Sequence, residues 1–224
     1  MTYVSEHKKL KQELPKLQKN NLFITFEGGE GAGKTTLIEE IFRYLTLHGY
    51  EVLKTREPGG TALGDKIRAL VLESRNENIA SLAELSLFLA SRAQHVEEVI
   101  LPALKAGKIV LCDRFNDSSV AYQGIARNLG KDAVSSACQF FSQNLEPTLT
   151  FYLDIDPSIG MLRVQRSREK DRIEQEDFSF HTLVRNAFLT IAKENPQRVF
   201  ILDASLPKSQ VQQIAIQKLC SIIL

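Results

Sequence analysis

A glycine-rich stretch containing a lysine and two threonines follows an apolar run near the start of the chain. Residues 28–35 read Gly-Gly-Glu-Gly-Ala-Gly-Lys-Thr, the pattern GxxxxGK[ST], and residues 22–26 before them read Leu-Phe-Ile-Thr-Phe. Glycine at positions 28 and 33 lets the backbone turn tightly and approach a ligand. The loop N–H groups and the positive end of a following helix attract phosphate. The pattern therefore predicts a site for a nucleoside triphosphate, formed by Gly28, Gly29, Glu30, Gly31, Ala32, Gly33, Lys34, Thr35 and Thr36.

Two side chains of this loop, and two at the end of a later strand, could handle phosphate and metal. Lys34 can reach the terminal phosphates, and the Thr35 hydroxyl is placed to ligate Mg²⁺. Residues 109–112, Ile-Val-Leu-Cys, indicate a buried strand that leads into Asp113-Arg114. A carboxylate there can hold Mg²⁺ directly or through water, and an arginine fork matches phosphate oxygens. We therefore expect Thr35 and Asp113 as metal ligands and Arg114 as a phosphate clamp.

A basic segment lies further along the chain and contains Arg163, Arg166, Arg168, Lys170 and Arg172. Kinases of small molecules close cations over the transferred phosphoryl group and exclude water from it. We expect residues of about 160–175 to form such a lid; the alternative is a basic helix face that is merely solvated. The catalytic candidates are therefore Lys34, Arg114, Arg163, Arg168 and Arg172.

Strand-like and helix-like stretches alternate along the chain, which is the pattern of a parallel sheet with helices on both faces. Strands are predicted at about 22–26, 51–55, 108–112, 148–155 and 198–202. Helices are predicted from the phosphate loop to Gly49, at 62–73, at 82–105 with a bend at Pro102, after Asp113 as far as Phe141, at 181–192 and at 208–222. We expect an α/β three-layer fold of the P-loop NTPase class with a five-stranded parallel sheet, in which ligands bind beyond the carboxyl ends of the strands.

Composition excludes several classes of protein. The chain has 224 residues, 43% of them hydrophobic and 25% charged, with a formal net charge of +1, so nothing indicates a nucleic-acid or membrane partner. The three cysteines lack C-x-x-C spacing and the four histidines are scattered, which favours reduced thiols in a cytoplasmic protein over disulfides or a zinc site. No apolar run approaches the ~20 residues that span a bilayer.

Residues 1–20 differ from the rest because they are rich in lysine and carry no apolar segment that would make a secretory signal. We expect a flexible basic N-terminal extension at 1–20 and a single P-loop kinase domain at 21–224.

Several further motifs together resemble bacterial thymidylate kinases. Arg56-Glu57-Pro58-Gly59-Gly60-Thr61 is similar to their REPGGT motif, and Asp113-Arg114-Phe115 with Ser118, Ser119, Ala121, Tyr122, Gln123 and Gly124 is similar to DR[YH]xxSxxAYQG. The segments Leu87–Arg92, Phe151–Asp154 and Asp171–Glu174 match further family segments. The resemblance runs from about residue 22 to the C-terminus, with the motifs in the family's order and spacing.

The resemblance implies a reaction in which ATP with Mg²⁺ gives its γ-phosphoryl group to the 5′-phosphate of dTMP, making dTDP and ADP, and it implies a homodimer paired through helices near residues 82–105. It also implies the acceptor site. By this resemblance, Phe88 would stack on thymine, and Arg92, Ser119 and Gln123 would surround the base. Tyr122 would press on the sugar, and Glu30 would face its 3′-hydroxyl. The dTMP-binding candidates are Glu30, Arg56, Phe88, Arg92, Arg114, Ser118, Ser119, Tyr122 and Gln123.

The chain departs from the family pattern at two positions. Gly31 stands where the eukaryote-like branch has an arginine, so the resemblance implies that the cation for the transferred phosphoryl group comes from the lid, whose arginine spacing is unusual here. Phe115 replaces the usual tyrosine or histidine.

Three alternatives remain open at this point. Another nucleoside monophosphate kinase would share the phosphate loop and the lid. A deoxynucleoside kinase would need a carboxylate base near the 5′-hydroxyl, for which Glu30 or Glu57 could serve. A nucleotide-binding module without catalysis would bind ATP and turn nothing over.

We predict that deletion of residues 1–20 leaves catalysis almost untouched, because every predicted site residue lies beyond residue 27. The measurement is kcat and KM of the truncated and full-length chains side by side. A large loss of activity in a truncated chain that keeps its circular-dichroism spectrum would contradict the prediction.

Overall fold

The computed structural model describes residues 21–73, 78–165 and 171–223. Its centre is a sheet of five parallel strands in the order β2-β3-β1-β4-β5. The strands are β1 (Phe23–Glu27), β2 (Val52–Arg56), β3 (Ile109–Asp113), β4 (Leu149–Asp154) and β5 (Val199–Asp203). The predicted five-stranded parallel sheet is therefore confirmed. Four of the strands begin and end one residue later than predicted, so Glu27, Arg56 and Asp113 are strand residues rather than loop residues.

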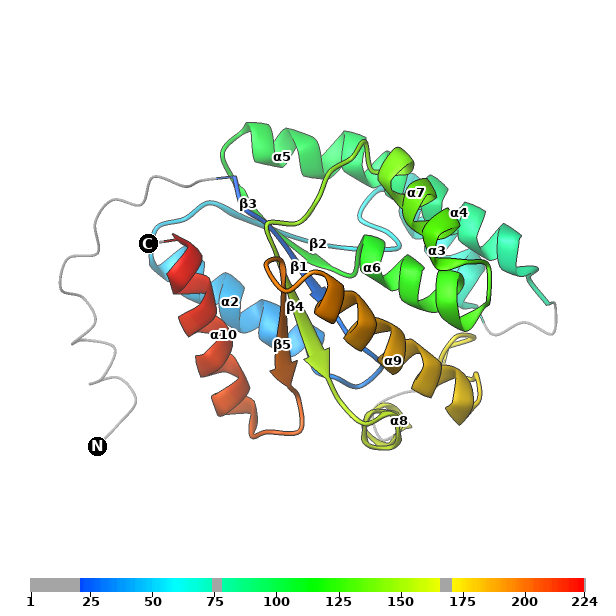
Figure 1. Ribbon diagram of the computed structural model, residues 1–224. Coiled ribbons are helices and arrows are strands. Elements are labelled where there is room, and N and C mark those ends of the chain that lie inside the picture. The colour runs from blue at the N-terminus through cyan, green and yellow to red at the C-terminus, as the bar shows by residue number, and fades with distance from the viewer. Residues whose placement is uncertain (1–20, 74–77, 166–170, 224) are drawn as a thin grey trace.

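Helices cover both faces of the sheet, which makes the three expected layers (Figure 1). The helices α2 and α10 pack on one face, and the remaining long helices pack on the other. Their bounds are α2 (Lys34–Leu47), α3 (Ala62–Leu72), α4 (Ser81–His95), α5 (Leu101–Lys105), α6 (Asn116–Ser119), α7 (Lys131–Phe141), α8 (Pro157–Gln165), α9 (Phe178–Glu194) and α10 (Lys208–Ile223).

The apolar spacing of α2 explains why it forms and what it contacts. Leu37, Ile41 and Leu45 recur every four residues and are 0–2% exposed, so they form one stripe on a helix. That stripe packs against Phe151 of β4 and Leu219 of α10 in one continuous core. Burial of each such side chain stabilises the fold by roughly 1.5–3 kcal/mol, and the core holds the helix that follows the phosphate loop against the sheet.

The predicted helix at 82–105 differs in its irregular point. The chain stays helical, but a π-helical segment, η1 (Val96–Ile100), joins α4 to α5 and ends two residues before Pro102. The irregular segment lies one turn before Pro102, because the proline ring crowds the carbonyl one turn before it and lacks an N–H. A wider turn accommodates both.

Two other helical predictions change in extent. The pattern from Asp113 to Phe141 divides into α6, a second π-helical segment η2 (Val120–Ala126) and α7. The helix predicted at 181–192 begins at Phe178, because the Asp177 carboxylate accepts a hydrogen bond from the Phe180 N–H at 2.7 Å and caps it.

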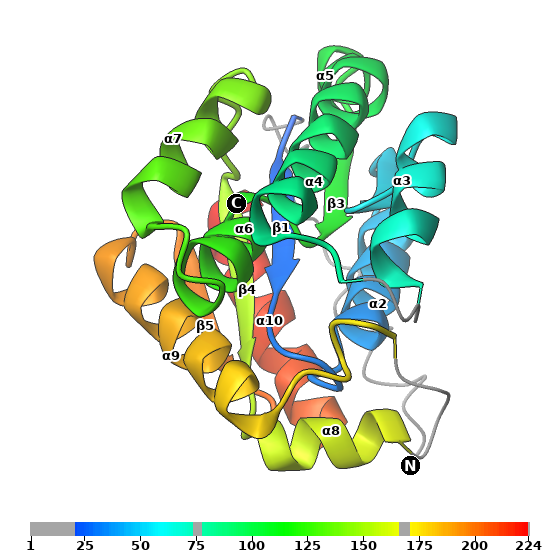
Figure 2. The same cartoon turned by 90° about the vertical axis from the view of Figure 1, so that its right-hand side faces the viewer.

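The carboxyl ends of β1, β3 and β4 lie together, and α8 crosses beneath them (Figure 2). Here α8 contacts the phosphate loop backbone to backbone. A Cβ on Gly31 would lie 2.2 Å from the Gly160 carbonyl oxygen, and one on Gly160 would lie 2.2 Å from the Glu30 oxygen. Only a pair of glycines allows this approach, which brings the start of the predicted lid against the phosphate loop.

Candidate active site

The phosphate loop joins β1 to α2 with its donors free to bind an anion. Gly33 precedes α2 with φ 95°, and no side chain of the described residues caps the helix. The Lys34 ammonium donates to the carbonyls of Gly28 and Gly29, each at 3.0 Å. Burial and then the Arg114 charge lower the pKa of Lys34. The loop is therefore suited to bind phosphate, because a bound anion would relieve the repulsion between Lys34 and Arg114.

The two predicted metal ligands face each other across the loop. The Thr35 hydroxyl lies 3.5 Å from Asp113 Oδ2, and Asp113 Oδ1 is buried without a hydrogen-bond partner among the described residues. An orphaned carboxylate oxygen beside a hydroxyl fits Mg²⁺, which takes hard oxygen ligands and keeps several waters. No cluster of three or more His, Cys, Asp or Glu side chains with metal-binding geometry occurs in the described ranges, so the residues fit a nucleotide-bound Mg²⁺ better than a protein cage.

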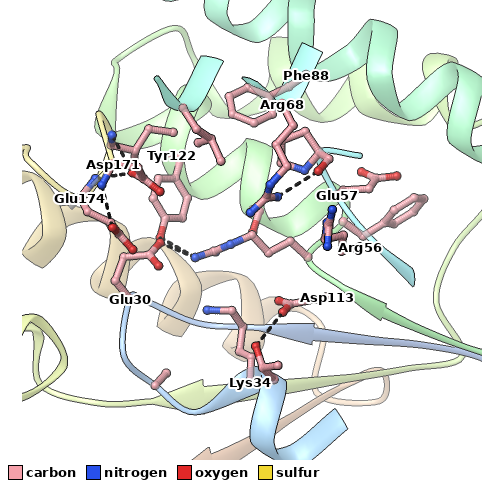
Figure 3. Close-up of a pocket in the computed structure, with 18 of the residues that line it drawn as sticks. Glu30, Lys34, Arg56, Glu57, Arg68, Phe88, Asp113, Tyr122, Asp171 and Glu174 are labelled. Atoms are coloured by element: carbon pink, nitrogen blue, oxygen red, sulfur yellow. Dashed lines mark hydrogen bonds and ion pairs between the residues drawn. The ribbon is translucent and has the colours of Figure 1, made fainter. Parts of the chain in front are cut away.

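One cavity of about 400 Å³ adjoins this loop. In Figure 3, Lys34 and Asp113 lie at one side, Glu30 and Tyr122 at another, and Phe88 and Arg68 at the opposite end. The cavity brings together most of the site residues predicted from the sequence. It is lined by Glu30, Gly31, Ala32, Gly33, Lys34, Thr35, Thr36, Arg56, Phe88, Arg92, Asp113, Arg114, Ser118, Ser119, Tyr122 and Gln123.

Arg114 lines the cavity and has a left-handed backbone conformation with φ 70°. Its guanidinium forms an ion pair with Glu30 and donates to the Gly28 carbonyl at 3.0 Å, to the Ser118 hydroxyl at 3.1 Å and to the Tyr122 hydroxyl at 3.3 Å. Burial alone would raise the pKa of Glu30, but Arg114 and then Lys34 lower it to about 2. Glu30 is therefore a carboxylate at neutral pH.

A third arginine, which was not predicted from the sequence, joins the two predicted phosphate clamps. Arg68 of α3 lines the cavity with Arg56 and Arg114, and it donates to the Pro58 carbonyl at 2.9 Å. Burial, and then the charges of Arg56 and Arg114, lower the pKa of Arg68. Three cations that repel one another in a shared cavity favour the binding of a multiply charged anion there. The sequence signal that could have identified Arg68 is its position, as an arginine on the helix that directly follows the motif at residues 56–61.

The end of the cavity beyond these cations is suited to a flat polar ring. Phe88 offers an aromatic face, and Arg92, only 2% exposed, lies beside it. The Arg92 guanidinium donates to Glu57 Oε2 at 2.8 Å and to the Ser119 hydroxyl at 3.0 Å. The His95 ring holds the other oxygen of Glu57 at 3.0 Å. Glu57 was a candidate base on the sequence alone; the structure instead gives both its oxygens to partners.

The three arginines predicted for the lid have different places. Arg163 of α8 donates to the Gly31 carbonyl at 3.3 Å, so it reaches the phosphate loop. Arg172 does not line the cavity in the described part of the chain. It donates to the Val71 carbonyl at 2.9 Å and forms an ion pair with Glu84. Arg168 lies outside the described residues. Of these three arginines, Arg163 is thus the one that contacts the phosphate loop in the described part of the chain.

A buried acid behind the phosphate loop was also missed. Glu27, the last residue of β1, is 1% exposed and accepts from the Phe115 N–H at 2.7 Å and the Ser118 hydroxyl at 2.5 Å. Burial and then the Asp117 charge raise its pKa to about 8. It fixes the backbone and the side chain that flank Arg114. An acid inside an apolar strand pattern was the signal that could have identified it.

We predict that Glu27 makes the protein lose stability as pH rises. The folded chain binds this proton more tightly than the unfolded chain between the ordinary pKa of 4.5 and about 8, so stability is present below that window and falls as pH rises through it. Relative to Glu27→Gln, the wild type should lose up to roughly 1.4 kcal/mol per pH unit there. Urea unfolding at pH 5.5 and 8 measures this. The exposed Glu51→Gln is the control, and a pH-independent difference for Glu27→Gln would contradict the assignment.

Comparison with known proteins agrees with this geometry. The sequence model of the family described as thymidylate kinase matches residues 26–215. The thymidylate kinase of Protochlamydia amoebophila (strain UWE25) is 48% identical over 91% of this chain and 94% of its own, and that of Chlamydia muridarum is 50% identical over 83% and 92%. The crystal structure of thymidylate kinase from Ehrlichia chaffeensis superposes with a TM-score of 0.72 at 33% identity, covering 88% of this chain and 98% of that one. The chain belongs to the thymidylate kinase family.

Proposed function

We propose that this protein transfers the γ-phosphoryl group of ATP to the 5′-phosphate of dTMP, giving dTDP and ADP. The observation that carries the proposal is one cavity lined by the phosphate loop, by the three arginines Arg56, Arg68 and Arg114, and by an end with the aromatic Phe88 and the amide of Gln123. A nucleotide carries its phosphate and its base at opposite ends, and the cavity has matching ends. The cations near the loop take the acceptor phosphate, and Phe88 and Gln123 take the base. Family membership supports the same assignment.

Catalysis in this proposal is positioning and charge neutralisation. Lys34 and the loop N–H groups hold the donor phosphates, and Arg163 approaches them from α8. Arg56, Arg68 and Arg114 hold the acceptor phosphate. The attacking phosphate oxygen is already ionised near neutral pH, since the second pKa of a phosphate monoester is about 6. No protein base is therefore required.

Mg²⁺ belongs to the proposal as a companion of ATP. Thr35 and Asp113 would hold it, as the unpartnered Asp113 oxygen supports. Bound there, the metal supplies positive charge that neutralises the phosphates of the donor.

The deoxynucleoside kinase alternative is weaker on these contacts. It needs a carboxylate that accepts a proton near neutral pH, and the pKa of Glu30 is lowered to about 2 by Arg114 and Lys34 against the effect of burial. Glu57 is occupied by Arg92 and His95. Glu30 is instead suited to accept a hydrogen bond from a hydroxyl group of the sugar, as it already does from the Tyr122 hydroxyl at 3.0 Å.

Assembly and location are part of the proposal as well. We propose a homodimer that pairs through α3 and α4, which pack together and expose Leu63, Leu70 and Leu82. None of the helices in the described ranges is long and apolar enough to cross a membrane. Cys112, Cys138 and Cys220 are free thiols, which supports a reducing compartment and hence the cytoplasm.

The test of the proposal is a coupled assay of ADP release with ATP and Mg²⁺ and each of dTMP, dUMP, dCMP, AMP, GMP and thymidine. We expect strong turnover with dTMP, weaker turnover with dUMP and none with thymidine, because thymidine brings no phosphate to the three arginines. Turnover with thymidine alone would make the protein a nucleoside kinase. ATP binding without any turnover would leave a nucleotide-binding module.

We predict that Arg163→Ala lowers kcat about tenfold or more and changes the KM for dTMP little, because its side chain contacts the phosphate loop and does not line the cavity. We expect the same of Arg168→Ala from the sequence. Arg43→Ala, on the exposed side of α2, is the matched control and should keep kcat. Unchanged kcat in both lid variants would remove these arginines from the transition state.

A further inference from the structure

The amide of Gln123 is held in one orientation by a buried acid on α4. Gln123 is 2% exposed and lines the cavity near Phe88, and its Nε2 donates to Glu84 Oε1 at 2.9 Å. Glu84 itself is 1% exposed. Neither side chain can turn toward bulk water, so the way in which they face each other decides which atom of the amide remains for a ligand.

Glu84 is a carboxylate in this setting. Burial would raise its pKa, but the hydrogen bond from Gln123, then the Arg172 hydrogen bond and the Arg127 charge, lower it. An ionised carboxylate only accepts hydrogen bonds. Gln123 can therefore meet Glu84 only through its N–H group, and its carbonyl oxygen is left to face the cavity.

The other contacts of Glu84 fix its position. Arg172 pairs with Glu84 Oε2 and is anchored by the Val71 carbonyl at 2.9 Å. Arg127 lies 3.3 Å from the same oxygen and 2.6 Å from Glu176. Guanidinium groups only donate hydrogen bonds. Glu84 is therefore the acceptor in every one of these contacts, with the two arginines and with the Gln123 amide.

We infer that Glu84 is a positioning residue that sets base specificity, by holding the Gln123 amide with its carbonyl oxygen toward the base. The inference rests on the proposed function of the cavity. The ligand class is a pyrimidine nucleotide with an N–H at ring position 3, as in thymine and uracil. Cytosine carries a lone pair there, which opposes the Gln123 oxygen. Arg92 already donates to Glu57, Cys138, Phe115 and Ser119, so it contributes mainly positive charge at this end of the cavity.

The test exchanges the carboxylate for an amide. Arg172 holds only Oε2 of Glu84, whereas Arg127 donates to Oε2 at 3.3 Å and to Oε1 at 3.4 Å. In Glu84→Gln, the new carbonyl oxygen takes the side of Arg172, so the new amide nitrogen faces Gln123 and the longer Arg127 contact. Gln123 must then present its oxygen to residue 84 and its N–H group to the cavity. Specificity constants for dTMP and dCMP are measured in the ADP-release assay. We expect kcat/KM to fall about tenfold for dTMP and to rise for dCMP, because a mismatched buried hydrogen bond costs about this much.

A swapped pair provides the rescue. In the double variant Glu84→Gln with Gln123→Glu, the carboxylate at position 123 accepts from the amide at position 84 and again offers an acceptor to the base. We therefore expect the preference for dTMP over dCMP to return. Arg127→Gln is the matched control, since it removes a partner of Glu84 and keeps the carboxylate. It should lower the melting temperature and leave the ratio of the two specificity constants unchanged.

The outcomes separate an orienting role from a structural one. A Glu84→Gln enzyme that loses activity toward dTMP and dCMP in the same proportion, with no rescue by the swap, would overturn the inference. If Glu84→Gln does not fold, Glu84→Gln with Arg127→Gln removes one opposite charge and keeps Arg172 to orient the new amide, and the same ratio is read from it. Absence of dTMP turnover in the wild type would instead refute the proposed function, so the two failures are distinguishable.

Discussion

The rest of the site depends on the pairing of Arg114 with Glu30 inside the cavity. A buried cation and a buried anion stabilise each other only where their geometry is held, and here the Gly28 carbonyl, Ser118 and Tyr122 hold it. These partners come from the phosphate loop, α6 and η2, so one guanidinium connects the phosphate loop to the two helical segments that follow β3. The charge of Arg114 lowers the pKa of Glu30. Glu30 is therefore a poor base and is suited to accept a hydrogen bond from a hydroxyl group.

Buried acids orient the groups that would touch the substrate, and this arrangement recurs through the cavity. Glu27 holds the backbone beside Arg114, Glu57 holds Arg92, and Glu84 holds the amide of Gln123. Each acid is 4% exposed or less. A cavity for a charged ligand needs donors and cations aimed inward before the ligand arrives. The buried acids behind them set the direction of these groups, and Glu84, whose pKa is lowered, also supplies charge balance.

The elements that position the site were predictable because local rules decide them. The phosphate loop between an apolar run and an amphipathic helix, and Asp113 at the end of a buried strand, follow from residue type and spacing. The errors have physical causes of the same local kind: the π-helical turn at 96–100 that accommodates Pro102, and the Asp177 cap that starts α9 early. Side-chain partners are set by contacts distant in sequence, so Arg68 and the carboxylates of Glu27 and Glu84 were not identified.

By itself, the sequence determined the fold class, the phosphate loop and the family, because these are carried by contiguous motifs whose glycines, apolar periods and spacing act within a few residues of one another. The tertiary structure alone decided which charges meet. It brought Arg163 to the loop and turned Arg172 toward Glu84, although both lie in one basic segment. Residues separated by 88 positions along the chain become an ion pair, and no local pattern encodes such a contact, since it depends on how helices from distant segments pack against the same sheet.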